Sequence, residues 1–245
     1  MQGPKAGARL SLRQGWLQAA AFRASRVGAE RRYRKAYQRG TLILMGKLIL
    51  IRHGESEGNA IRHFTTSPEA GITELGRRQA SEAARRIKAF FTPTLIVSSP
   101  YFRARETARI IAELIGAPLE IEPDFREQSL GQLAGMSYDV VRADPTYRAD
   151  RSWEWRPAGG ESQQDVRMRS APALDRWAKA HPDREMIIVS HGGVMRTLWA
   201  HVTGSWEGSH IPANCGIVVV EHDASRYLVP RVLAAEIDAE RESGG

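Results

Sequence analysis

Short apolar runs, separated by longer segments of mixed polarity, recur along most of this chain. Runs that contain no charged residue are typical of strands covered on both faces. The clearest are residues 48–51, 95–98 and 186–189. A strand-like run at 119–122 and two late segments, 217–221 and 227–233, are further expected strands.

The segments between these runs place apolar residues three or four positions apart, as in a helix with one buried face. Thr73 is suited to cap the start of one such segment, and Gly116 directly follows the end of another. We therefore expect helices at residues 73–91, 101–115 and 162–180, and a further helix from about residue 194. Strands that alternate with helices predict an α/β fold, a three-layer α/β/α sandwich with a mostly parallel central sheet.

Basic residues are concentrated at the start of the chain. The formal net charge is +7, but residues 1–44 hold ten Lys or Arg and one acid, which leaves the remainder slightly acidic. Nucleic-acid binding by the folded body is therefore not expected. We expect three parts, namely a basic extension at 1–44, a domain at 45–235 and a polar tail at 236–245.

Residues 1–44 have three interpretations. They are a disordered basic arm that contacts anionic partners, an organelle-targeting segment, or a stretch that the mature protein lacks. We favour the third, because Met45 directly precedes the first expected strand. The single cysteine, Cys215, cannot form an internal disulfide, and no apolar run approaches the ~20 residues of a membrane-spanning helix. We expect a cytoplasmic protein, with a homodimer as one oligomeric state that the sequence leaves open.

Three of the expected strands end in residues that suit anion binding. Arg52 and His53 follow the first strand, Ser99 with Arg103 follows the second, and His191 follows the third. Parallel strands bring their carboxyl ends to one edge of a sheet, where sites of such folds lie. Glycines at 54, 192 and 193 would let backbone N–H groups approach an oxyanion.

A pocket of this kind suits phosphoryl transfer. Arginine binds two phosphoryl oxygens at once, and a neutral imidazole can attack phosphorus. A carboxylic acid must then protonate the departing oxygen, and Glu127 is placed for this after the run at 119–122.

Together these residues resemble the histidine phosphatase superfamily, also called the phosphoglycerate mutase-like family. The resemblance covers about residues 47–235 and rests on four motifs in the family's order. These are Arg52-His53-Gly54-Glu55, Arg103-Ala104, Arg126-Glu127 with Gly131 and Gly135, and Ser190-His191-Gly192-Gly193.

The resemblance implies a phosphoglycerate mutase-like fold and a role for each matching residue. His53 would be the nucleophile that becomes phosphorylated, and Glu127 the proton donor that later activates water. The phosphoryl oxygens would be held by Arg52, Arg103 and His191, with Asn59 and Gly192 also at the phosphate. The run 159–162 resembles a helix-entry motif of phosphatase members.

Only 63 residues separate Glu127 from His191, whereas the glycolytic mutases carry a longer insert there. This favours a phosphatase that hydrolyses small phosphorylated metabolites without a cofactor over a mutase, with a non-catalytic protein of the same fold as a further alternative. A metal site built on the two histidines and Glu127 is disfavoured, because the neighbouring arginines would repel a cation. Trp153 and Trp155 either cap the substrate or pack within their own segment, and the sequence does not separate the two.

Overall fold

A six-stranded sheet organises the part of the chain that the computed structural model describes, residues 45–65, 67–209, 211–223 and 225–233. Its strands lie in the order β3-β2-β4-β1-β5-β6. Their bounds are β1 Gly46–Arg52, β2 Leu95–Ser98, β3 Leu119–Ile121, β4 Glu185–Ser190, β5 Ile217–His222 and β6 Arg231–Leu233. The predictions for residues 1–44 and 236–245 lie outside the described residues.

The four strands β3, β2, β4 and β1 run parallel, and β5 and β6 complete the sheet in antiparallel pairings. The predicted mostly parallel sheet is therefore confirmed. In its register Arg52 pairs with Ser190 and Ser98 pairs with Val189. The carboxyl ends of β1, β2 and β4 are therefore level at one edge of the sheet.

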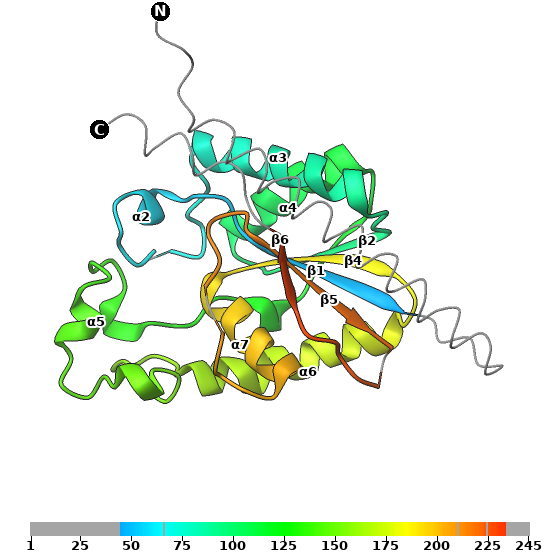
Figure 1. The fold of residues 1–245 in the computed structure, drawn as a ribbon. Coiled ribbons are helices and arrows are strands. Elements are labelled where there is room, and N and C mark those ends of the chain that lie inside the picture. Colours follow the sequence, from blue (N-terminus) through cyan, green and yellow to red (C-terminus); the bar gives the residue numbers. More distant parts are fainter. Residues whose placement is uncertain (1–44, 66, 210, 224, 234–245) are drawn as a thin grey trace, which may run out of the picture. The chain divides into compact units, whose positions relative to one another are not determined.

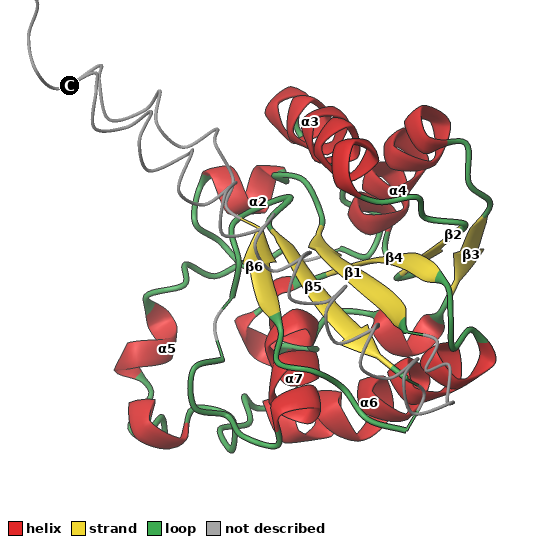
Figure 2. Ribbon diagram, turned by 45° about the vertical axis from the view of Figure 1, so that its right-hand side comes forward, coloured by secondary structure: helices red, strands yellow, loops and turns green. Residues whose placement is uncertain are grey.

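Helices cover both faces of the sheet, as Figures 1 and 2 show. On one face lie α3 (Glu74–Phe90) and α4 (Phe102–Ile115), and on the other α6 (Gln163–Ala180) and α7 (Gly192–Thr203). Shorter elements are α2 (Glu57–Ala60), α5 (Val140–Ala143) and three 3₁₀ turns, Pro123–Phe125, Gly131–Leu133 and Ala149–Arg151. Among the described residues, no helix is both long and apolar enough to span a membrane.

The helix ends follow the expected capping chemistry. The Gly76 N–H donates to Thr73 Oγ1 at 3.1 Å, which caps α3, and Gly116 ends α4 with φ +84°. Ser162 caps α6 and forms a capping box with Asp165.

Two predicted element boundaries, one of a helix and one of a strand, differ from the structure. Helix α7 begins at Gly192, two residues before the expected start. The last strand is confined to Arg231–Leu233, because the preceding Pro230 has no N–H to donate to a sheet ladder.

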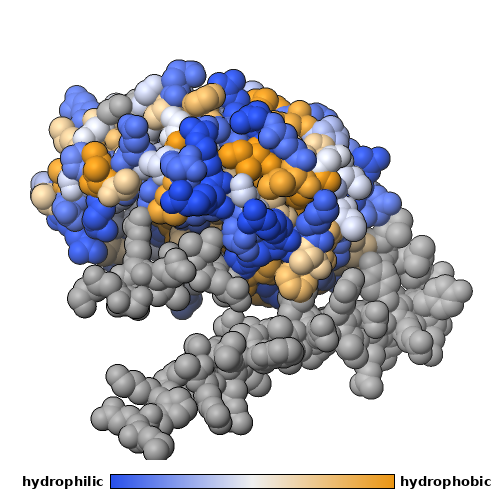
Figure 3. Space-filling model, turned by 90° about the horizontal axis from the view of Figure 1, so that it is seen from above, coloured by the Kyte–Doolittle hydropathy of each residue, from blue (hydrophilic) through white to orange (hydrophobic). Residues whose placement is uncertain are grey.

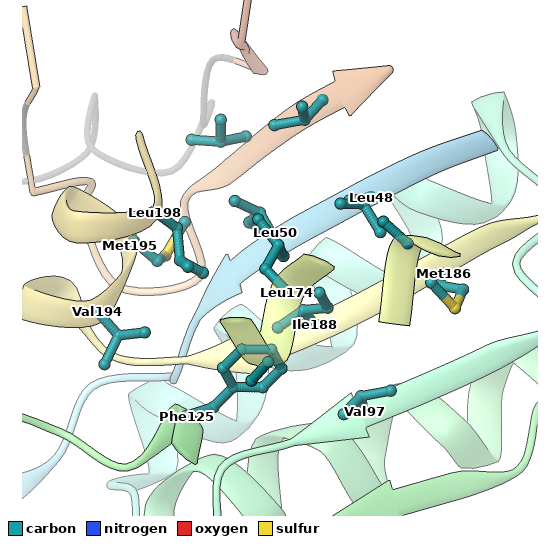
Figure 4. Packing of buried hydrophobic residues seen from close by; sticks show 14 of the residues in the cluster. Leu48, Leu50, Val97, Phe125, Leu174, Met186, Ile188, Val194, Met195 and Leu198 are labelled. Carbon is teal, nitrogen blue, oxygen red and sulfur yellow. The ribbon is translucent and has the colours of Figure 1, made fainter. Parts of the chain in front are cut away.

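Alternate residues of the strands face opposite helical layers. Leu48, Leu50 and Ile188 belong to the cluster that the sheet forms with α6 and α7, together with the buried Phe125 (Figure 4). Against the opposite face, α3 buries small residues such as Ala80 and exposes charged ones. Figure 3 views the molecule from the α3 side of Figure 1, where hydrophilic residues cover most of the surface.

Candidate active site

The level ends of β1 and β4 place both candidate histidines at one edge of the sheet. Because Arg52 pairs with Ser190, His53 and His191 are the next residues on neighbouring strands. The His53 N–H donates to the Ser190 carbonyl at 2.9 Å, and the two imidazole centroids lie 5.2 Å apart. The structure therefore brings together the two histidines that the strand-end pattern singled out.

The hydrogen bonding of His53 fixes which ring nitrogen can react. Its Nδ1 lies 2.7 Å from the Gly54 carbonyl oxygen, which can only accept, so Nδ1 carries the proton. The lone pair is then on Nε2. Burial lowers the pKa of His53 well below its usual value, and the positive charges of Arg103 and Arg52 lower it further. The ring is therefore neutral at pH 7, as a nucleophile must be.

His191 is fully buried at the amino terminus of α7. Ser99 Oγ accepts from the Tyr101 N–H at 3.3 Å and lies 2.7 Å from His191 Nε2, to which it can donate. The ring's proton is then on Nδ1, which is buried without a partner among the described residues. Burial first, and then Arg103, lower the pKa of His191 well below its usual value. His191 is therefore a neutral donor that an oxyanion could satisfy.

The half-buried Arg52 and the buried Arg103 lie beside the histidines without an ion pair among the described residues. Arg52 Nη1 donates to the Pro212 carbonyl at 2.8 Å, and Arg103 Nη1 to the Ser67 carbonyl at 3.4 Å. The Nε atom of each is buried without a hydrogen-bond partner. Burial lowers the pKa of both guanidiniums, while the charge of Glu127 opposes it. Buried cations with free donors require an anion, and two of them match a phosphoryl dianion.

Glu127 reaches this pocket from the loop after the 3₁₀ turn Pro123–Phe125. Its Oε1 accepts from the Gln128 N–H at 2.9 Å, and its Oε2 from the Gly193 N–H at 3.3 Å. A Cβ atom at Gly193 would lie 2.5 Å from Oε1, so glycine is required for this approach. At Gly192 a Cβ would lie 2.5 Å from Ile211 Cγ2 and 3.6 Å from Arg52 Nε. Both glycines therefore keep the start of α7 open.

Arg169 of α6 holds the Glu127 loop in place, a role that no sequence motif indicated. It donates to the carbonyl oxygens of Asp124 at 2.7 Å, Arg126 at 2.8 Å and Glu127 at 3.1 Å. It also binds both carboxylate oxygens of Glu161, each at 2.9 Å. Burial opposes ionisation of Glu161, but these bonds hold its pKa below the usual value. This gives the run at 159–162 a structural role beside the site.

Asn59 lines the pocket, but its amide is already engaged. Its Oδ1 accepts from the Ser56 N–H at 3.3 Å and from Asn214 Nδ2 at 3.0 Å. Its Nδ2 donates to the Tyr138 hydroxyl at 2.9 Å. Asn59 therefore positions Tyr138, and its contact with phosphate stays a prediction. Neither Asn214 nor Tyr138 was singled out from the sequence.

These side chains surround a cavity of about 470 Å³. The candidate residues Arg52, His53, Arg103 and Glu127 line it, while His191 lies buried next to His53. The cavity's other walls include aromatic, aliphatic and amide side chains, among them Phe64, Tyr101, Leu130, Tyr138, Gln128 and Gln163.

Two alternatives from the sequence concern a metal site and the packing of Trp153 and Trp155. Among the described residues, no three His, Cys, Asp or Glu side chains are grouped as metal ligands. Trp153 stacks on Trp206 with ring centroids 5.7 Å apart, and Trp155 Nε1 donates to Asp144 at 3.1 Å. Neither tryptophan lines the cavity; Trp155 packs within its own segment, whereas Trp153 packs against Trp206 in the loop after α7.

Comparison with known proteins agrees with this geometry. A family model described as histidine phosphatase superfamily (branch 1) matches residues 48–233. A glucosyl-3-phosphoglycerate phosphatase of Mycolicibacterium vanbaalenii is 36% identical over 64% of this chain and 74% of its own. A metal-independent phosphoserine phosphatase of Arabidopsis thaliana is 32% identical over 70% and 75%.

A probable phosphoglycerate mutase of Photorhabdus laumondii is 29% identical over 75% of this chain and 88% of its own. Among solved structures, a mycobacterial glucosyl-3-phosphoglycerate phosphatase in complex with VO3 superposes with a TM-score of 0.67. It is 28% identical, and the match covers 77% of this chain and 98% of that one.

Proposed function

The chain belongs to the histidine phosphatase superfamily, and we propose that it hydrolyses small phosphomonoesters through a phosphohistidine at His53, without a metal ion. It is a phosphoric monoester hydrolase, as its named phosphatase relatives are. The observation that carries the proposed mechanism is the pairing of a neutral imidazole with two arginines, Arg52 and Arg103, whose buried Nε donors have no partner among the described residues. We place the enzyme in the cytoplasm.

In the first step the two guanidiniums hold the phosphoryl oxygens and spread the charge of the transition state. The His53 Nε2 lone pair attacks phosphorus, so that an N–P bond forms as the P–O bond to the leaving group breaks. The Glu127 carboxyl donates its proton to the departing oxygen, which leaves as an alcohol. His191 Nδ1 donates a hydrogen bond to a phosphoryl oxygen.

In the second step the Glu127 carboxylate removes a proton from water as the water oxygen attacks phosphorus. The N–P bond breaks, its electron pair returns to His53 Nε2, and inorganic phosphate is released. Glu127 is then protonated again and ready for the next substrate. One carboxyl group therefore serves as acid and then as base at the same position.

Phosphoglycerate mutase activity is the second candidate, because a relative carries that name. A mutase must return the phosphoryl group to the bound alcohol, which requires water to be kept from the phosphohistidine. The interconversion of 3- and 2-phosphoglycerate, primed with the bisphosphate, separates the two. We expect phosphate release and no interconversion.

The test of the proposed function is hydrolysis of p-nitrophenyl phosphate in EDTA. We expect turnover by the wild type and by His181→Ala, a control whose ring stacks on Trp177 outside the cavity. His53→Ala should lose activity by about a thousandfold or more, as loss of a nucleophile does in other enzymes. Full activity of His53→Ala, or loss of wild-type activity in EDTA, would contradict the proposal.

A further inference from the structure

The charged side chains among the described lining residues of the cavity are Arg52, Arg103 and Glu127. Arg52 and Arg103 are the cations among its described lining residues, and both are needed for the phosphoryl group. Glu127 is the carboxylate that faces the same space. A leaving group with a carboxylate of its own would therefore find no further cation among the described lining residues and would lie near a like charge.

Aromatic and aliphatic side chains make up part of the remaining lining. Phe64 and Tyr138 pack with ring centroids 4.8 Å apart, and Leu130 and Tyr101 also line the cavity. The Tyr138 hydroxyl accepts from Asn59, so its own proton stays available to donate. These walls suit the carbon skeleton of an alcohol better than a second anionic group.

Hydrogen bonds between the side-chain amides of Gln128 and Gln163 leave one acceptor without a partner among the described residues. Gln128 Nε2 donates to the Glu161 carbonyl oxygen at 2.6 Å, which leaves Gln128 Oε1 as an acceptor. Gln163 Nε2 donates to that oxygen at 2.6 Å. Gln163 Oε1 is consequently a buried acceptor without a partner among the described residues, on a side chain that lines the cavity.

An unsatisfied buried acceptor beside a substrate cavity calls for a donor from the substrate. A hydroxyl supplies one, whereas a carboxylate would place oxygen lone pairs against Gln163 Oε1. We infer that the leaving group is an uncharged alcohol with a second hydroxyl, such as a polyol or sugar, and that Gln163 accepts from that hydroxyl. This inference rests on the proposed phosphatase function, and it sets the chain apart from relatives named for phosphoserine and glucosyl-3-phosphoglycerate.

The direct test compares glycerol 3-phosphate with 3-phosphoglycerate, which differ by a hydroxymethyl group in place of the carboxylate. We expect kcat/KM to be at least about tenfold higher for glycerol 3-phosphate. An equal or higher value for 3-phosphoglycerate would overturn the inference while leaving the phosphatase function intact. Hydrolysis of neither compound, nor of p-nitrophenyl phosphate, would overturn both.

Two variants test the walls separately. Gln163→Met keeps the length of the side chain but removes the acceptor. It should lower kcat/KM for glycerol 3-phosphate about tenfold and change that for p-nitrophenyl phosphate, which has no hydroxyl, much less. Equal losses on both substrates would contradict the role given to Gln163.

The second variant, Leu130→Lys, adds a cation to a half-buried wall position. It should raise kcat/KM for 3-phosphoglycerate relative to glycerol 3-phosphate, and the neutral control Leu130→Met should not. No change in that ratio with Leu130→Lys would show that the missing cation does not set the preference.

Discussion

Arg169 Nη2 donates to the Glu127 carbonyl oxygen at 3.1 Å, and the same guanidinium binds both carboxylate oxygens of Glu161. The planar guanidinium is held by the Glu161 carboxylate and in turn binds the carbonyl groups of the Glu127 loop. Lysine has no such fork, so it cannot bind the carboxylate and the loop carbonyls together. Arg169 is thus a positioning residue that acts through Glu127.

Arg169→Lys should lower kcat/KM for alkyl phosphates by about 10- to 100-fold, because the proton donor is no longer held at the leaving oxygen. The loss should be smaller for p-nitrophenyl phosphate, whose leaving group needs less protonation. The matched control is Arg176→Lys on the same helix, where the exposed arginine pairs with the buried Glu122. An equal loss on both classes of ester would indicate a general structural defect instead.

Gly193→Ala should affect activity more than folding. The added Cβ would lie 2.5 Å from Glu127 Oε1, at the far end of a flexible side chain, so the carboxylate can move away. We expect kcat to fall about tenfold or more with a small change in Tm. The assay is steady-state hydrolysis of glycerol 3-phosphate beside thermal unfolding, and unchanged kcat would contradict the placement of Glu127.

The fold and the main site residues could be predicted from the sequence, since both depend on local patterns. Buried runs defined the central strands, and His53, His191 and Arg52 lie at or directly after strand ends whose level register brings them together. The remaining residues depend on long-range packing. Arg169 lies 42 positions from Glu127, and the free acceptor of Gln163 follows from an amide chain that passes through Gln128. No sequence motif or periodicity indicated either contact.

Stability should fall as the pH drops below about 6.5, the ordinary pKa of histidine. His53 and His191 stay neutral in the folded protein because their pKa values are well below that value, whereas the unfolded chain takes up protons. Unfolding is therefore favoured by acid between the unfolded and folded pKa values, by up to about 1.4 kcal/mol per pH unit for each histidine.

Urea unfolding at a series of pH values checks this dependence. The His53→Gln variant should lose less stability than the wild type between pH 7 and pH 5, because one buried imidazole is gone. The control His181→Gln, at a half-buried position away from the cavity, should follow the wild type. A wild type whose stability is flat over this interval would contradict the neutral state of both rings.

The most direct test of the central claim is to trap phosphohistidine at His53. The variant Glu127→Gln is mixed with p-nitrophenyl phosphate, whose leaving group departs without the acid, and the missing base should let the intermediate accumulate. After an alkaline denaturing quench, intact mass analysis should show the mass of one added phosphoryl group, and peptide mapping should place it on His53. Absence of that added mass despite a burst of nitrophenol, or its location on His191 or another residue, would contradict the account.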